Sequence, residues 1–126
     1  MALTACHFEI HVHSLHAAQA FYVDTLGLEV LQSMPEIKLL AVKAGAVRLS
    51  IFEDAKAADI EAACLSGGHV IFRTDDLIKT ITALQSKGVS VGGVSEAPGF
   101  MRYIQLHDPS GNVIEIAQYL RDPLMA

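Results

Sequence analysis

Two histidines and one glutamate are the side chains of this sequence that could hold a metal ion. His7 and His69 lie far apart in the chain, and Glu115 lies further on. Two imidazoles and a carboxylate on one side of a divalent ion leave its other positions open to water or substrate, as in non-haem iron sites and several manganese and zinc sites. A single histidine in an apolar strand is more often a hydrogen-bonded core residue. The metal hypothesis therefore depends on whether the fold brings the three together.

The segments that carry the two histidines repeat one pattern. Residues 6–13 alternate between polar and apolar side chains, which predicts a strand with one apolar face. A helix is predicted over residues 15–26, from its apolar spacing, a serine cap and a closing glycine. The same order recurs after Gly67-Gly68, and each histidine precedes the first leucine of its helix, Leu15 or Leu77, by eight residues. The two histidines thus open equivalent strands.

Three further strands are predicted after each helix. The first half offers a small meander over 28–33, 37–44 and 47–54. In the second half we expect one strand directly after Gly88 and then a hairpin of residues 100–107 and 112–119, whose turn contains proline and glycine. The predicted fold class is α+β, with two βαβββ modules whose sheets form a cupped mixed β-sheet. Such a cup would let His7, His69 and Glu115 point to one place.

The length of 126 residues favours one domain over residues 1–126. We expect module one over 5–53, a helical or irregular connector over 54–66 and module two over 67–120.

Composition excludes several classes of function. The formal net charge is −5, with 14 acidic and nine basic residues and no basic run, so a nucleic-acid partner is not expected. Two cysteines provide neither a disulfide framework nor a thiolate zinc site. The N-terminal segment lacks the pattern of a secretory signal, and no stretch has the apolar length of a membrane span. We therefore expect no membrane partner and a cytoplasmic location.

Two stretches carry a family resemblance. HFEIHVHSLHAAQAFYVDTLGLEV and HDPSGNVIEI closely resemble the signature segments of the vicinal oxygen chelate superfamily, the glyoxalase, bleomycin-resistance and extradiol-dioxygenase fold. The resemblance covers essentially the whole chain. Its most specific features are FY followed by LG in the first predicted helix, and DPSGN before the Ile-Glu pair. It places His7, His69 and Glu115 on the family's three recurrent metal positions. It implies one divalent metal per site (Mn, Fe, Zn or Ni) and a small-molecule substrate.

Two branches of this family fit the sequence poorly. Enzymes similar to glyoxalase I have a fourth ligand, a glutamate, where this chain has Arg48, and a guanidinium cannot ligate a cation. Extradiol dioxygenases and fosfomycin glutathione transferases usually have a tyrosine ten residues before the glutamate ligand, where Gln105 stands. Tyr103 could substitute only if the strands paired in a different register. Both branches are weakened, and the second is not excluded.

The complete triad favours an enzyme over a pure binding protein, since bleomycin-resistance proteins usually lack it. We expect a divalent-metal-dependent enzyme acting on a small vicinally oxygenated substrate, of lyase, isomerase or dioxygenase type. In the lyase and isomerase types the metal would polarise a carbonyl while a side chain moves a proton. The alternative is a bleomycin-resistance-like protein that sequesters a ligand without catalysis.

The remaining candidate residues would surround the metal. Glu9 is the candidate proton carrier, because it shares a strand face with His7 and is expected to have few solvent contacts. Alternatively, it is a rim residue paired with Arg48 or Arg73. The candidate substrate contacts share a position on the inward faces of the predicted strands: His11, Arg48, Arg73, Tyr103 and Gln105. The two arginines could bind an anionic group such as a carboxylate. His11 could instead support a metal ligand.

The resemblance also implies a homodimer. Small members of this family commonly build each cup from modules of two chains. His7 would then face His69 and Glu115 of the partner, so the sites would be shared between chains and metal binding would be linked to dimerisation.

Overall fold

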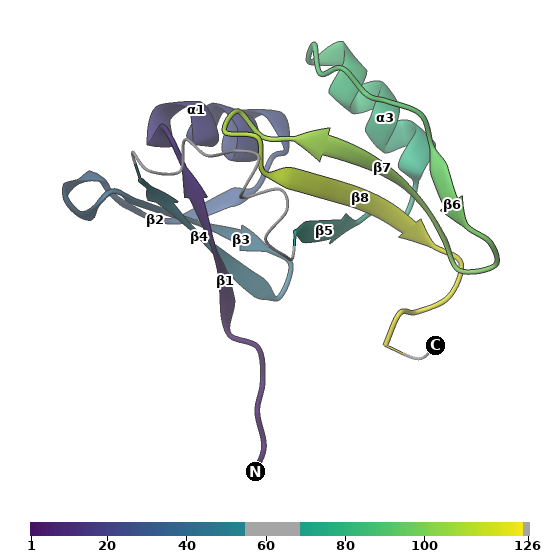
Figure 1. Cartoon of the computed structure of the whole chain (residues 1–126), viewed down its shortest axis with the longest axis horizontal. Helices are drawn as coiled ribbons and strands as arrows, with labels where there is room; N and C mark the ends of the chain where they lie inside the picture. The colour runs from purple at the N-terminus through teal and green to yellow at the C-terminus, as the bar shows by residue number, and fades with distance from the viewer. Residues whose placement is uncertain (55–68, 125–126) are drawn as a thin grey trace. The chain divides into compact units, whose positions relative to one another are not determined.

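The computed structural model describes residues 1–54 and 69–124, and its strands form two four-stranded mixed sheets (Figure 1). The chain divides into two compact units, Met1–Ser66 with Asp108–Asn112 and Gly67–His107 with Val113–Ala126. Each unit has the order strand, helix and three strands. The predicted α+β class with two βαβββ modules is therefore confirmed. The single-domain organisation stays a prediction, and nearly all of the expected connector over 54–66 lies outside the described residues.

The sheet of the first unit has the strand order β1-β4-β3-β2, in which β1 runs parallel to β4 and the other neighbours are antiparallel. Its strands are β1 (His7–Val12), β2 (Glu29–Met34), β3 (Leu39–Ala44) and β4 (Val47–Glu53). A short 3-10 helix, η2 (Pro35–Ile37), joins β2 to β3. The predicted first strand and meander are confirmed.

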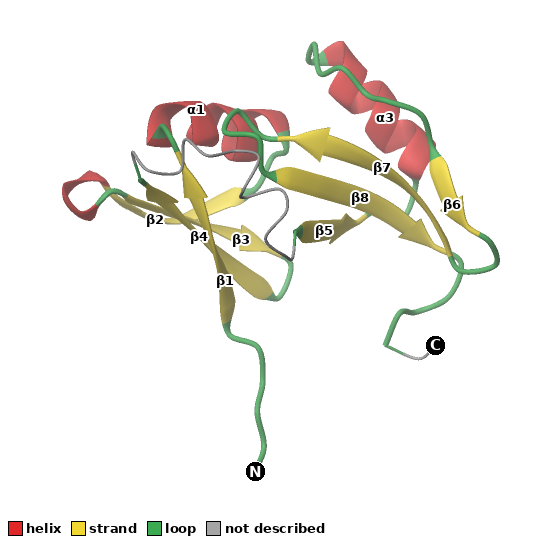
Figure 2. Cartoon of the chain, viewed as in Figure 1, coloured by secondary structure: helices red, strands yellow, loops and turns green. Residues whose placement is uncertain are grey.

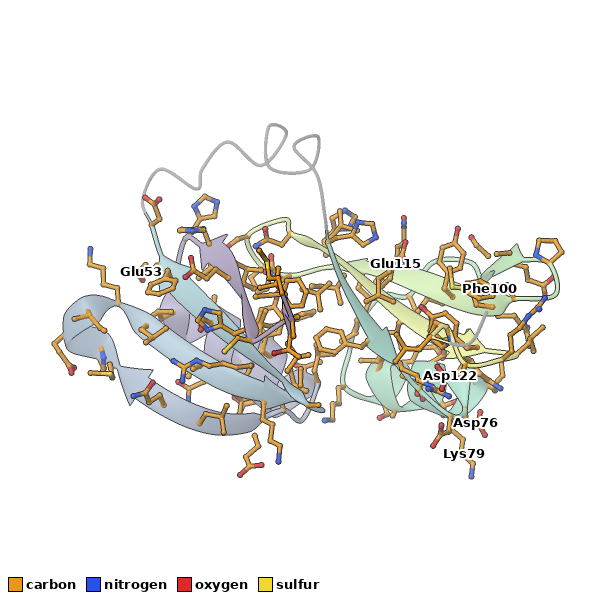
Figure 3. The ribbon with its side chains drawn as sticks, turned by 90° about the horizontal axis from the view of Figure 1, so that it is seen from below. Glu53, Asp76, Lys79, Phe100, Glu115 and Asp122 are labelled. Atoms are coloured by element: carbon orange, nitrogen blue, oxygen red, sulfur yellow. The ribbon has the colours of Figure 1, made fainter. Side chains whose placement is uncertain are left out.

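One helical segment packs on this sheet against β3 and β4 (Figure 2). It consists of α1 (Leu15–Gln19) and the π-helical continuation η1 (Ala20–Thr25). Two side chains satisfy its free N-terminal N–H groups: Ser14 accepts from the backbone of Ala17, and Glu53 of β4 accepts from that of Leu15 (Glu53 is labelled in Figure 3). The predicted helix and its serine cap are confirmed.

The sheet of the second unit repeats this plan with the order β5-β8-β7-β6, in which β5 and β8 are parallel. Its elements are β5 (Val70–Arg73), α3 (Leu77–Ser86), β6 (Ser95–Ala97), β7 (Met101–His107) and β8 (Val113–Tyr119). Asp76 caps α3 by accepting from the backbone of Lys79 at 3.0 Å (both labelled in Figure 3). The hairpin of β7 and β8 is confirmed. No helix in the described ranges is long and apolar enough to cross a membrane.

The prediction of a strand directly after Gly88 is wrong. The backbone N–H of Val89 donates to the carbonyl of Leu84 and so closes the C-terminal turn of α3 instead of joining a sheet. Gly92 and Gly93 follow without side chains to pack. The next strand, β6, begins only at Ser95.

Each sheet has an apolar side that packs with its helix. In the first unit these buried side chains are Val12, Ala18, Tyr22, Leu40, Val42, Leu49 and Ile51. In the second unit they are Leu77, Leu84, Ile104, Leu106, Ile114 and Ile116. The apolar face of β1 is buried only toward its end, since Val12 is covered whereas Phe8 is 56% exposed.

A buried tyrosine–aspartate contact anchors the DPSGN turn within the first unit. The Tyr22 hydroxyl donates to Asp108 Oδ2 at 2.8 Å, and both side chains are buried. Asp108 Oδ1 accepts from the backbone N–H groups of Ser110 and Asn112, and the Asn112 amide also donates to Oδ2. Burial, and then the nearby Asp108 charge, raise the pKa of Tyr22 far above its usual range. Tyr22 is therefore a protonated donor at neutral pH.

We predict that Tyr22→Phe lowers the free energy of unfolding by about 1–3 kcal/mol at neutral pH, because it removes a donor from a buried carboxylate. The raised pKa means that this stabilisation is complete below the unfolded pKa of about 10 and declines as the pH rises above it. Chemical denaturation of the two proteins measures the difference. The half-buried Tyr103 supplies the control variant Tyr103→Phe, and equal losses in both variants would contradict the assignment.

Candidate functional site

His69 and Glu115 meet in the second unit. His69 directly precedes β5, and Glu115 lies in the neighbouring strand β8, where it pairs in register with Ile71 (Glu115 is labelled in Figure 3). The His69 Nε2 and Glu115 Oε1 atoms are 3.1 Å apart. The Glu115 side chain is 9% exposed and that of His69 is 35% exposed. The second unit thus presents an imidazole nitrogen and a carboxylate oxygen at one place that solvent can reach from the histidine side.

Gln105 makes the other contact to this carboxylate. Its Nε2 donates to Glu115 Oε1 at 3.0 Å across the β7–β8 pair. The register places Gln105 opposite Glu115 and Tyr103 opposite Ala117. Tyr103 therefore does not lie directly opposite the glutamate. Gln105 occupies that position, where the related dioxygenases were expected to have a tyrosine.

Glu115 is a buried carboxyl group, which is costly unless hydrogen-bond donors or a positive charge lie beside it. Its side-chain partners in the described part of the chain are Gln105 and His69. A His69 ring with its proton on Nε2 donates to this carboxylate, whereas a ring with its proton on Nδ1 leaves the Nε2 lone pair for a bound cation.

His7 belongs to a polar network in the first unit. It opens β1 and pairs in register with Arg48 of β4. The Ser50 hydroxyl accepts from Arg48 Nε at 3.1 Å and lies 3.4 Å from His7 Nδ1. Arg48 Nη2 donates to Gln32 Oε1 at 2.8 Å. Arg48 is thus the direct register partner of His7, whereas the position of the first sheet that matches Glu115, opposite the residue two after the histidine, holds Ser50.

Glu9 lies one alternation beyond His7 on β1 and pairs in register with Ser50. It is exposed, so the expectation that it has few solvent contacts is not met within one chain. The alternative that Glu9 pairs with an arginine finds no support at Arg48, whose two hydrogen bonds go to Ser50 and Gln32.

His11 and Arg73 lie nearer the far ends of their strands. The His11 ring stacks on Phe52, with centroids 6.0 Å apart and an interplanar angle of 28°. Its Nδ1 is 3.8 Å from Asp54 Oδ2, which is too far for a hydrogen bond. Arg73 ends β5 opposite Ala117 and is exposed. Both side chains are accessible to a ligand in the single chain.

The predicted site residues fall into two groups. The second unit joins His69, Glu115 and Gln105, whereas His7 and Arg48 belong to the first unit. Among the residues for which the structure gives positions, no three His, Cys, Asp or Glu side chains form a group that could hold a metal. The three-ligand centre remains a prediction. Sequence reasoning missed Ser50, because an isolated serine in a strand gives no signal until the register places it beside His7.

Comparison with known proteins places these features in a family context. Residues 5–116 match the family model described as the Glyoxalase/Bleomycin resistance protein/Dioxygenase superfamily. No curated protein matches the chain.

Solved structures share its fold over nearly the whole length. Lactoylglutathione lyase from Agrobacterium tumefaciens is 23% identical, with a TM-score of 0.75 and coverage of 94% of this chain and 95% of that one. TnmS3, an antibiotic binding protein from Streptomyces sp. CB03234, is 27% identical, with a TM-score of 0.73 and coverage of 94% and 98%. The likeness extends to both an enzyme and a binding protein.

Proposed function

Because the chain belongs to the glyoxalase/bleomycin resistance protein/dioxygenase superfamily, we propose that it is a divalent-metal-dependent enzyme acting on a small substrate with two neighbouring oxygens. His7, His69 and Glu115 would hold the metal, which is Mn, Fe, Zn or Ni. The observation that carries this proposal is the 3.1 Å contact between His69 Nε2 and Glu115 Oε1, with the carboxylate almost fully buried.

The donor set in the second unit fits a first-row cation. An imidazole nitrogen and a carboxylate oxygen are ligands that these ions accept. His69 Nε2 and Glu115 Oε1 are 3.1 Å apart, so both would be able to reach one ion. Gln105 orients the carboxylate, as hydrogen bonds to ligand carboxylates do at other metal sites.

The surroundings of His7 also suit a ligand. Ser50 has two acceptor lone pairs, so its hydroxyl can accept from Arg48 Nε and also from His7, if the neutral His7 ring carries its proton on Nδ1. That tautomer keeps the Nε2 lone pair of His7 free for a cation. A neighbour that fixes the tautomer in this way is usual for metal-binding histidines.

We propose a homodimer with shared sites, in which the first unit of one chain and the second unit of its partner supply the three ligands. The support is the division of the ligands between two compact units of the chain. The cupped surface would be completed by this association. A cytoplasmic location also stays a prediction.

The reaction is best assigned to the lyase or isomerase type. The metal, when bound, would polarise a substrate carbonyl. Glu9 is then the residue that moves a proton, since its carboxylate shares a face of β1 with His7 and is accessible. Neither Arg48 nor Ser50 of β4 is a glutamate, which argues against lactoylglutathione lyase activity. Gln105 in place of a tyrosine argues against the dioxygenase type. His11, Arg73 and Tyr103 would contact substrate.

A second candidate is a protein that sequesters a ligand without catalysis. The likeness to the antibiotic binding protein TnmS3, at 27% identity over 94% of the chain, favours it. The exposed apolar side chain of Ile71, which is in register with Glu115, would suit an apolar part of such a ligand. Metal content separates the two candidates.

We predict that purified protein carries a stoichiometric first-row metal, and that His69→Ala removes most of it because one of the three ligands is lost. Elemental analysis after gel filtration measures the content. His16→Ala, a change of an exposed helix histidine, is the matched control and should keep the metal. Metal-free wild-type protein that tightly binds a glycopeptide antibiotic would instead support sequestration and overturn the enzyme proposal.

We predict that Glu9→Gln leaves metal content unchanged but lowers turnover by about a hundredfold or more, because the amide cannot accept the proton. The assay uses whichever compound is turned over in a screen of 2-oxo aldehydes, 2-oxo acids and 2-hydroxy acids. Glu29→Gln, on the edge strand β2, is the matched control and should retain activity. A rate unchanged by Glu9→Gln removes this residue from the mechanism.

A further inference from the structure

Three side chains with basic character form a row across the first sheet. His7, Arg48 and Lys43 are successive partners in register on β1, β4 and β3. Residues paired in this way point to the same face of a sheet, and neighbouring strands are about 4.8 Å apart. The row therefore places Arg48 on the strand next to His7 and Lys43 one strand further away.

Within residues 1–54 and 69–124, Arg48 is held in place by uncharged partners. Its hydrogen bonds there go to the Ser50 hydroxyl and the Gln32 amide oxygen. These bonds use Nε and one Nη2 hydrogen and fix the plane of the half-buried guanidinium. Arg102 on β7 has a different environment, because its Nε lies 3.2 Å from the Glu96 carboxylate in an ion pair that is not a regular hydrogen bond. Arg48 keeps its full charge and its remaining donors for a ligand.

The acidic residues nearest the row do not cancel it. Glu9 is in register with Ser50, one step further along the sheet, and Glu29 is in register with Lys43 at the far edge. Both glutamates and Lys43 are exposed, so water and salt weaken their interactions. Lys43 therefore contributes less to anion binding than Arg48 does.

From this arrangement, and resting on the proposed function, we propose that Arg48 binds a carboxylate of the substrate that is bonded to the carbon carrying a metal-chelating oxygen. The substrate class is then the 2-oxo or 2-hydroxy acids. A guanidinium matches a carboxylate through two parallel N–H···O bonds. The Ser50 hydroxyl lies 3.1 Å from Arg48 Nε and 3.4 Å from His7 Nδ1, so a small acid that chelates a metal held by His7 could reach the guanidinium through a carboxylate close to its chelating oxygen.

The test compares two probes that both offer neighbouring oxygens. Oxalate carries carboxylates, and catechol is neutral at pH 7. Calorimetric titration into metal-loaded wild type, Arg48→Gln, Arg48→Lys and the control Arg121→Gln gives the affinities. Arg121 is a suitable control because its only structural partner in the described chain is the carbonyl of Gly99. Thermal unfolding of each variant checks that it is folded.

We expect oxalate to bind at least about tenfold more weakly to Arg48→Gln, with catechol unchanged. Arg48→Lys should recover part of the loss, because it keeps the charge but not the forked geometry. Arg121→Gln should bind both probes as the wild type does. Unchanged oxalate affinity in Arg48→Gln, or equal losses for oxalate and catechol, would overturn the proposal.

A second measurement separates this proposal from the metal site. Oxalate titrated into metal-free protein should shift the NMR signal of the Arg48 Nε–H, and Arg121→Gln should leave that shift intact. A shift in protein that never takes up metal would keep the anion site and refute the metal proposal. Normal metal uptake, with no shift of the Arg48 signal and no weaker oxalate binding in Arg48→Gln, would keep the metal proposal and refute the anion site.

Discussion

The burial of one carboxylate is the constraint on which the rest of the site depends. Glu115 lies in the middle of β8 with apolar neighbours, and its side chain is 9% exposed. Such a group is costly to bury unless hydrogen-bond donors or a positive charge lie beside it. The fold meets this requirement by pairing β8 with β5 on one side and with β7 on the other, which brings His69 and Gln105 to the same oxygen. The proposed metal site depends on the pairing of these three strands.

The polar residues beside the histidine differ in the first unit. Its sheet repeats the strand order of the second, but the position that matches Glu115, opposite the residue two after the histidine, holds Ser50 rather than a carboxylate, and Arg48 pairs with His7 itself. Ser50 links the guanidinium to His7, and Gln32 fixes its other end. On the two proposals above, the second module would hold a cation and the first an anion. Together they would suit a small acid that chelates a metal, and they explain why the fold alone does not determine the reaction.

Much of this arrangement could be predicted from the sequence. The equal spacing of His7 and His69 from their helices revealed the duplication, and the short DPSGN turn set the register that places Gln105 opposite Glu115. The contacts of Arg48 could not be predicted, because the irregularity between Val30 and Gln32 decides which β2 side chain reaches it. The strand expected after Gly88 failed because the end of α3 uses the Val89 N–H. Local patterns identify elements, whereas contacts across strands depend on bulges and helix ends.

Mixing two variants that each lack one metal ligand tests most directly whether His7 of one chain and the His69–Glu115 pair of another bind the same cation. His7→Ala and His69→Ala chains would each lack metal alone. After unfolding and refolding together, mixed dimers contain one intact site if ligands are shared, because an unaltered His7 then meets an unaltered His69 and Glu115. The account predicts that metal reappears only in the mixture, at about one ion per mixed dimer. A mixture as poor in metal as its parents, with mixed dimers demonstrated by mass, would contradict the shared site.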